Sequence, residues 1–293
     1  MFADRVASMS EISAHVRVYS PSKELRKPYR LVCDLFRDIW DGRELSWRLF
    51  VRDFKAQYSQ TALGYVWAFL PPLFASFTFV FLQQQGFVRV EGLGVSYAAF
   101  AMIGTMLWQT FVESIQSPLQ ALTSAKPMLA KINFPRESIL VAGMYMVLVS
   151  TLIRMLMIFG IMLAWGIVPG VSLLLLPFFL FGLMVCGFAF GMAMVPLGGL
   201  YGDIARSIPI FTQFWMLLTP VVYPEPTSGW AGWLSNWNPV ASILAMCRAT
   251  LTNDPLDRMG LACTHIVLFS FVSLVGVVCF RLIMPHLIAR MGG

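Results

Sequence analysis

The chain has 293 residues, of which 58% are hydrophobic and 12% are charged, and its formal net charge at pH 7 is +6. A soluble domain carries roughly 25% charged residues, so this composition excludes an ordinary globular enzyme and indicates an integral membrane protein. The positive charge does not indicate a nucleic-acid partner, because eleven of the 21 Lys and Arg residues precede residue 60, ahead of the first long apolar run.

The N-terminal part of the chain divides into a leader and an amphipathic segment. Residues 1–33 are polar, carry mixed charges and contain no apolar stretch of a signal peptide, so we expect a cytoplasmic leader. In residues 34–58, aromatic and aliphatic side chains fall on one helical stripe, and Glu44 and Arg48 form an i,i+4 pair on the charged face. This pattern predicts an interfacial helix that Gly42 bends, although a helix that packs on a partner protein has the same pattern.

Six segments that follow are long and apolar enough to cross a bilayer, which takes about 20 residues each. With the N-terminus inside, 17 Lys and Arg residues fall on the cytoplasmic side, three fall outside, and one lies within a span. We therefore expect an all-α membrane domain at residues 59–284, with both termini, including a tail at 285–293, in the cytoplasm. The expected spans are residues 62–82, 97–117, 139–166, 171–198, 207–223 and 262–280.

Two connections between the expected spans are too elaborate to be plain linkers. The cytoplasmic connection at residues 118–138 has three prolines, three basic residues and a short apolar helix pattern, so we expect a docking loop. The external connection at residues 224–260 contains two apolar pieces too short to span, which we expect to dip into the outer leaflet or line an exit. Asn238 before Pro239 predicts the cap and first turn of the second piece.

Motifs for catalysis or nucleotide binding are absent from the sequence. No lysine follows a glycine, so there is no P-loop, and neither H-E-x-x-H nor G-x-S-x-G occurs. The five cysteines do not have the spacing of a zinc site. We therefore expect no catalytic, cofactor or metal site in this chain.

Few ionisable residues fall within the expected spans, namely Glu113, Arg154 and His265. Such sparse charge argues against coupling to an ion gradient and favours energy supplied from elsewhere. Arg154 is either a functional group or a structural partner for a polar group, and Glu113 is expected at an exposed helix end. Gly187 and Gly191 form a G-x-x-x-G pattern, from which we expect a close helix contact within the chain rather than a dimer seam.

Several short motifs occur in order along the chain, and together they resemble one family. They are RDFKAQY at 52–58, LGYVW at 63–67, KINFPRE at 131–137, YGDI at 201–204, TPVVYP at 219–224 and NP at 238–239. On a six-span background this order resembles the permease subunits of polysaccharide ABC exporters of the type-2 exporter class. The resemblance covers residues 35–285, although Gly202 stands where members often carry a basic residue.

The resemblance implies that the chain is half of a transporter rather than an enzyme. Two copies would form the transmembrane pathway, and two separate ATPase subunits would bind ATP and Mg in the cytoplasm. The cargo would be a polyprenyl-linked polysaccharide, such as O antigen of lipopolysaccharide, capsule or teichoic acid, which crosses the cell inner membrane. Membrane lipids, and no nucleic acid, complete the implied partners.

The resemblance also suggests which residues act. Residues of the docking loop would couple to the ATPase, namely Lys126, Lys131, Phe134, Pro135, Arg136 and Glu137. Arg48, Arg52 and Lys55 would meet the lipid diphosphate at the inner interface, or serve only to orient and anchor the chain. Candidates for an external gate are Trp230, Trp233, Asn238 and Pro239.

A glycan pathway should be rich in aromatic side chains, because sugars stack on aromatic faces. For any single ring, ordinary membrane packing is the simpler interpretation. The candidates are Tyr65, Trp67, Trp108, Phe211, Phe214 and Trp215.

Two other functions remain open from the sequence. A permease of the same class could export a small lipid or drug, although the interfacial helix and the long external loop favour a polymer. A membrane-embedded lipid-processing enzyme would need several polar catalytic groups near an interface, and the expected spans contain almost none.

Overall fold

The computed structural model describes residues 28–59, 70–85, 95–129, 134–226 and 228–291, and every regular element among them is a helix. This confirms the expected all-α fold. The elements are α3 (Pro28–Asp41), α4 (Arg43–Ser59), α5 (Leu70–Gln84), α6 (Tyr97–Leu129), α7 (Glu137–Ala164), the 3-10 segment η2 (Val171–Leu175), α8 (Leu176–Gly198), α9 (Gly202–Leu218), α10 (Gly229–Trp237), α11 (Pro239–Thr252) and α12 (Met259–Met291).

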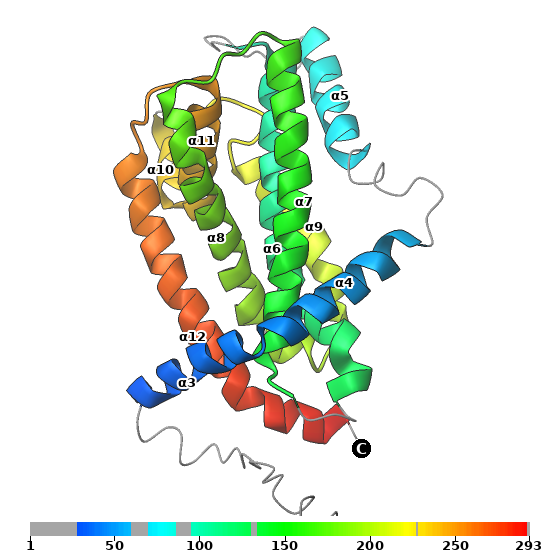
Figure 1. Cartoon of the computed structure of the whole chain (residues 1–293). Coiled ribbons are helices and arrows are strands. Elements are labelled where there is room, and N and C mark those ends of the chain that lie inside the picture. The colour runs from blue at the N-terminus through cyan, green and yellow to red at the C-terminus, as the bar shows by residue number, and fades with distance from the viewer. Residues whose placement is uncertain (1–27, 60–69, 86–94, 130–133, 227, 292–293) are drawn as a thin grey trace, which may run out of the picture.

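The central element of the bundle is α6. It contacts α5, α7, α8, α9 and α11, and 22 of its 33 residues are buried. α12 packs on α8 along the side of the bundle, and α11 contacts α6, α8 and α12 near the upper end in Figure 1. A helix enclosed in this way can carry polar side chains that would be costly if they faced lipid.

α6 and α8 approach each other closely at the G-x-x-x-G pattern. A Cβ atom added to Gly187 would lie 2.6 Å from the carbonyl oxygen of Phe111, and one added to Gly191 would collide with the carbonyl oxygen of Ile115. Small residues allow two helix backbones to approach this closely. The glycines therefore form a contact within the chain, as expected from the sequence.

Among the described residues, three helical segments are long and apolar enough to cross a membrane, and they coincide with the expected third, fourth and sixth spans. They are Glu137–Ala164, Val171–Gly198 and Met259–Pro285. α6 has sufficient length but carries polar side chains, whereas α5 and α9 have 15 and 17 residues. The expected number of six spans therefore stays a prediction.

Several helix ends differ from the expected ones. α6 does not stop before the expected connection at 118–138 but continues to Leu129, with Pro118 inside it. Proline normally bends or ends a helix. Here the Pro118 ring packs directly on α8, because a Cβ added to Gly191 would lie only 3.0 Å from the ring. α9 begins before the expected fifth span and ends at Leu218, ahead of the Thr219-Pro220 turn. α12 continues into the expected tail as far as Met291, and its last part lies across the lower end of the bundle (Figure 1).

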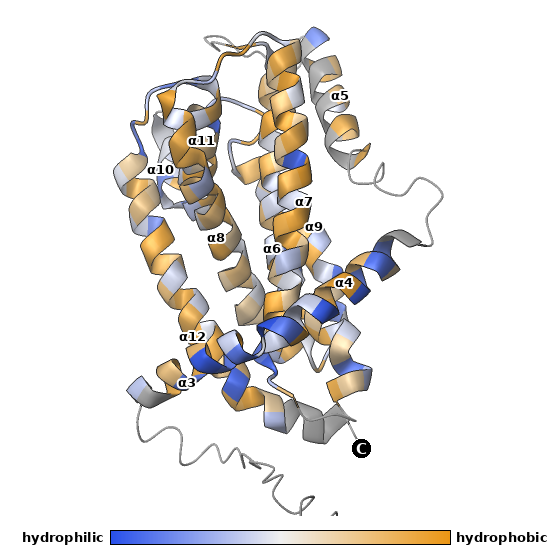
Figure 2. Ribbon diagram, viewed as in Figure 1, coloured by the Kyte–Doolittle hydropathy of each residue, from blue (hydrophilic) through white to orange (hydrophobic). Residues whose placement is uncertain are grey.

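α3 and α4 also lie across the lower end of the bundle (Figure 1). The segment expected as one interfacial helix is thus two helices that meet at Gly42. A Cβ at Gly42 would lie 2.9 Å from the Asp38 carbonyl oxygen and would collide with Ser138 Oγ, so glycine permits the joint to touch α7. In Figure 2, hydrophilic residues gather on α3, α4 and this end of the bundle, whereas α7, α8 and α12 are mainly hydrophobic.

The apolar stripe of α4 packs largely on its own chain. Leu49 and Phe50 are buried, and the rings of Phe50 and Tyr145 on α7 are 6.0 Å apart. Trp40 and Trp47 remain exposed. Part of the stripe is therefore used in packing within the chain, which neither interpretation predicted, and two tryptophans of the segment remain exposed.

The α6–α8 contact predicts that a side chain at position 191 destabilises the fold. Gly191→Val should lower the free energy of unfolding by roughly 1–3 kcal/mol, because the added methyl groups force the two backbones apart. The measurement is the thermal midpoint of the purified protein in detergent. Gly160→Val on α7 is the matched control, since nothing lies within 4 Å of a Cβ at that position. Equal melting of the two variants would contradict the prediction.

Candidate functional site

A row of polar side chains runs along one face of α6. Its members, spaced by three or four residues and therefore aligned on a helix, are Gln109, Glu113, Gln116, Gln120 and Ser124. Gln120 Nε2 donates a hydrogen bond to Gln116 Oε1 at 3.1 Å. Polar groups are costly inside an apolar bundle and usually mark a cavity or a route for a polar ligand.

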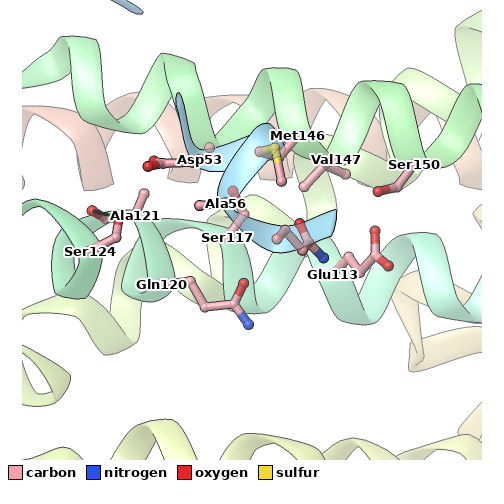
Figure 3. A pocket seen from close by; sticks show the side chains of 12 residues that line it. Asp53, Ala56, Glu113, Ser117, Gln120, Ala121, Ser124, Met146, Val147 and Ser150 are labelled. Carbon is pink, nitrogen blue, oxygen red and sulfur yellow. Dashed lines mark hydrogen bonds between the residues drawn. The ribbon is translucent and has the colours of Figure 1, made fainter. Parts of the chain in front are cut away.

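The polar row opens into a cavity between α4, α6 and α7 with a volume of about 420 Å³. This α4–α6–α7 cavity is shown in Figure 3, where Gln120 and Ser124 project from α6 and Ser150 from α7. Its lining is Asp53, Ala56, Gln57, Glu113, Ser117, Gln120, Ala121, Ser124, Gly143, Met146, Val147 and Ser150.

A second cavity, of about 390 Å³, lies between α6 and α9. Gln120 and Ser124 line both cavities, so the two adjoin along the same face of α6. The other wall of this α6–α9 cavity is formed by Ala205, Ile208 and Pro209. The polar face of α6 thus leads from the α4–α6–α7 cavity to an apolar wall formed by α9.

Glu113 on the wall of the α4–α6–α7 cavity forms an ion pair with Arg154 of α7. The Arg154 side chain is 5% exposed and that of Glu113 is 35% exposed, so the pair connects the cavity to the protein interior. Arg154 also donates to Thr110 Oγ1 at 3.4 Å. Of the two roles that the sequence left open for Arg154, the structure provides the structural partner, and Glu113 is not a free helix end.

The aromatic candidates fall into two groups. Trp108 is buried, and its ring lies 6.4 Å from that of Trp215, which packs at 4.9 Å on Phe190 of α8. Phe211 and Phe214 are 61% and 66% exposed on the outer face of α9. Trp108 and Trp215 are thus part of the interior packing, whereas the two phenylalanines are open to the surroundings of this single chain. Tyr65 and Trp67 lie outside the described residues.

The basic residues of α4 lie on its exposed face. Arg48 forms the expected pair with Glu44 at 2.6 Å, and Arg52 forms a pair with Asp53 at 2.7 Å. Lys55 is exposed. Since Asp53 also lines the α4–α6–α7 cavity, the cationic surface of α4 directly borders that cavity.

A buried ion cluster joins three segments that are far apart in the sequence. Arg281 of α12 contacts Asp38 of α3 at 2.8 Å and Glu137 of α7 at 3.4 Å, and all three side chains are at most 8% exposed. Glu137 lies at the end of the expected docking loop at 118–138 and is the first residue of α7. This loop is therefore anchored at its end to both the N-terminal helices and α12.

Four of the remaining residues expected to couple to an ATPase lie within the described part of the chain. Lys126 donates a hydrogen bond to the carbonyl oxygen of Gly199 at 3.2 Å, which ties the end of α6 to the end of α8. Phe134, Pro135 and Arg136 are half-buried. Lys131 lies outside the described residues.

At the opposite end of the bundle, two of the sequence motifs meet. Asn238 Nδ2 donates to Thr219 Oγ1 at 2.8 Å, and Asn238 Oδ1 accepts from the Val240 amide at 3.2 Å. The second bond confirms the expected cap of α11, which begins at Pro239. Trp230 and Trp233 are exposed on α10.

Buried Arg248 holds the turn after α9 in place. Its guanidinium donates to the carbonyl oxygens of Val221 at 2.5 Å and Pro220 at 3.4 Å, and it lies 3.7 Å from the centre of the Phe100 ring. A Cβ on Gly104 of α6 would collide with this arrangement. Counted from the sequence as an external loop charge, Arg248 is instead part of the protein interior.

Comparison with known proteins now identifies the family, since residues 44–252 match the ABC-2 type transporters. The chain belongs to the ABC-2 type transporter family. It is similar to an O-antigen export system permease protein RfbA of Klebsiella pneumoniae, with 24% identity over 236 residues, which cover 78% of this chain and 88% of the relative. A protein of the same name from Myxococcus xanthus is 22% identical over 242 residues, covering 80% and 92% of the two chains.

Two features of this ABC-2 transporter chain were missed at the sequence level. The polar row on α6 had a signal, because Gln109, Glu113, Gln116 and Gln120 recur at helical spacing. The Arg281 cluster had no signal in the sequence, since Asp38 and Arg281 are 243 positions apart. Each of the two residues is, in its local sequence, an ordinary charge beside an apolar run.

The ion cluster predicts a large effect of Arg281→Gln in this ABC-2 transporter chain. The substitution removes the cation that two buried carboxylates contact. Removing one partner of a buried ion pair lowers the free energy of unfolding by roughly 3–5 kcal/mol. Thermal unfolding of the purified protein is the measurement. Arg206→Gln is the control, because Arg206 and its partner Asp203 are 85% and 93% exposed. A midpoint for Arg281→Gln as high as that of the control would disprove the structural role of the cluster.

Proposed function

We propose that this ABC-2 transporter chain is the permease subunit of an ATP-driven exporter of lipid-linked polysaccharide, such as O antigen, capsule or teichoic acid. Two copies of the chain and two ATPase subunits would form the exporter in the cytoplasmic (inner) membrane. The observation that carries the proposal is the similarity to O-antigen export permeases over 78–80% of this chain. The two adjoining cavities on the polar face of α6 support it, because a glycan needs hydrogen-bonding groups inside an apolar bundle.

We place the end of the bundle that carries α3 and α4 in the cytoplasm, together with both termini. The excess of basic residues on this side supports that orientation. Arg48, Arg52 and Lys55 then lie at the inner membrane surface, where they can bind the lipid diphosphate. The exposed rings of Trp40 and Trp47 on the same helices suit the acyl boundary.

The glycan pathway would follow the polar face of α6 and the exposed face of α9, where a second copy of the chain would form the opposite wall. Phe211 and Phe214 supply the sugar-stacking surface there, and Tyr65 and Trp67 are further candidates. Trp108 and Trp215 support this surface from behind, because both pack in the interior. At the outer end, the gate comprises the α10 tryptophans Trp230 and Trp233 and the turn fixed by Asn238 and Pro239.

ATP and Mg would be bound by the partner ATPase, whose movement reaches the permease through the loop between α6 and α7. Phe134, Pro135 and Arg136 are the contacts we propose, together with Lys131. Lys126 and Glu137 would transmit the movement rather than receive it, because their side chains are bonded to Gly199 and Arg281. The Arg281 cluster would carry the displacement to α3 and α12.

Deletion of the gene tests the proposal directly. The expected result is loss of one surface polysaccharide and accumulation of its lipid-linked form inside the cell, both reversed by the wild-type gene. Tagged permease should also co-purify with an ATPase subunit. An unchanged set of surface polysaccharides, together with accumulation of a small lipid or drug, would assign the chain to another ABC-2 exporter.

The proposed coupling loop gives a second prediction. Phe134→Ala and Arg136→Glu should leave ATP hydrolysis by the complex but reduce export at least tenfold, because the loop would no longer follow the ATPase. Arg136→Lys, which keeps the charge, should retain most export. ATPase activity and surface polysaccharide are measured on the same cells. Full export by both disruptive variants would remove these residues from the coupling role.

A further inference from the structure

We propose that the α4–α6–α7 cavity is a binding site for the sugar residue next to the diphosphate of the lipid-linked glycan. The proposal rests on the proposed function and adds a substrate-recognition site to it. The volume of about 420 Å³ is within the size range of small-ligand pockets, roughly 300–1,000 Å³.

The hydrogen-bonding groups of the cavity suit a polyhydroxyl ligand. Hydroxyl and amide side chains line it from three helices, with Gln57 on α4, Gln120 on α6 and Ser150 on α7. Ser117 is only 6% exposed, lines the cavity, and its hydroxyl has no hydrogen-bond partner within the described part of the chain. That oxygen is itself buried, so the hydrogen-bonding groups that a ligand can reach are those of Gln57, Gln120 and Ser150.

The charged groups of the cavity make it unsuitable for a phosphate or for a free cation. Its lining contains two carboxylates and no Lys, Arg or His, so it does not suit a phosphate. Nor does it suit a free cation, because Asp53 is paired with Arg52 and Glu113 with Arg154. Paired carboxylates still accept hydrogen bonds from hydroxyl groups, and Met146 and Val147 offer an apolar surface for the C–H face of a sugar ring.

The position of the cavity connects it to both the lipid and the pathway. Asp53 and Gln57 lie in the cavity wall, while Arg52 and Lys55 of the same helical turn are exposed beside it. A diphosphate held by these cations thus places its first sugar at the cavity. Gln120 and Ser124, shared with the α6–α9 cavity, then lead the following sugars toward α9.

A comparison of two probes tests the sugar site. The permease, purified with its ATPase in nanodiscs, is titrated with a polyprenyl diphosphate that carries one N-acetylhexosamine and with the same polyprenyl diphosphate without sugar. The sugar-bearing probe should bind with a roughly tenfold lower Kd, because the sugar forms hydrogen bonds in the cavity that the bare probe lacks. Lys55→Gln should weaken both probes equally.

Variants of the cavity separate the sugar from the lipid. Ser150→Leu, which fills the cavity, and Gln57→Leu, which removes hydrogen bonds, should abolish the preference for the sugar-bearing probe and leave the Kd of the bare probe unchanged. That unchanged Kd also establishes that the variants are folded. Ser270→Leu on the exposed side of α12 is the matched control and should keep the preference.

The outcomes distinguish failure of the sugar site from failure of the proposed function. Equal binding of the two probes by the wild type, or a preference that survives in Ser150→Leu, overturns the sugar site alone. Binding of neither probe by the wild type overturns the lipid-linked substrate as well. A preference lost only in the cavity variants supports the site.

Discussion

The close approach of α6 and α8 is the constraint on which the rest of the bundle depends. Gly187 and Gly191 let the two backbones touch, and the ring of Pro118 packs into the same contact. With α8 this near, most of α6 is buried among its neighbours, and its polar face opens onto the two cavities. The two cavities exist because the central helix can be polar on one side.

Buried arginines fix both ends of the bundle around this core. Arg281 joins α3, α7 and α12 at one end, and Arg248 holds the turn after α9 against α6 at the other. Each guanidinium bonds to groups from segments that are distant in the chain. Because these groups are buried, removing the arginine alone would lower the free energy of unfolding strongly. In the proposed exporter, a movement imposed at the loop before Glu137 would therefore reach several helices together.

Sequence patterns predicted the elements that form through local interactions. Mean hydropathy located α7, α8 and most of α12, and the Asn238-Pro239 pair gave the start of α11 together with its cap. The end of α6 was not predicted, because Pro118 is a local stop signal that packing on Gly191 overrides. The aromatic candidates were separated only by burial, since Trp108 packs inside while Phe211 and Phe214 are exposed.

The sequence by itself determined that this is an all-helical membrane protein of the ABC-2 type, with a basic N-terminal amphipathic segment and no nucleotide motif. Those properties follow from composition, helical periodicity and short motifs, which are local. The tertiary structure decided that Arg154 is paired with Glu113, that Asp38 meets Arg281 across 243 positions, and that the polar side of α6 borders α4 and α9. Such pairings depend on how the helices pack, and no local pattern specifies which distant side chains share a buried space.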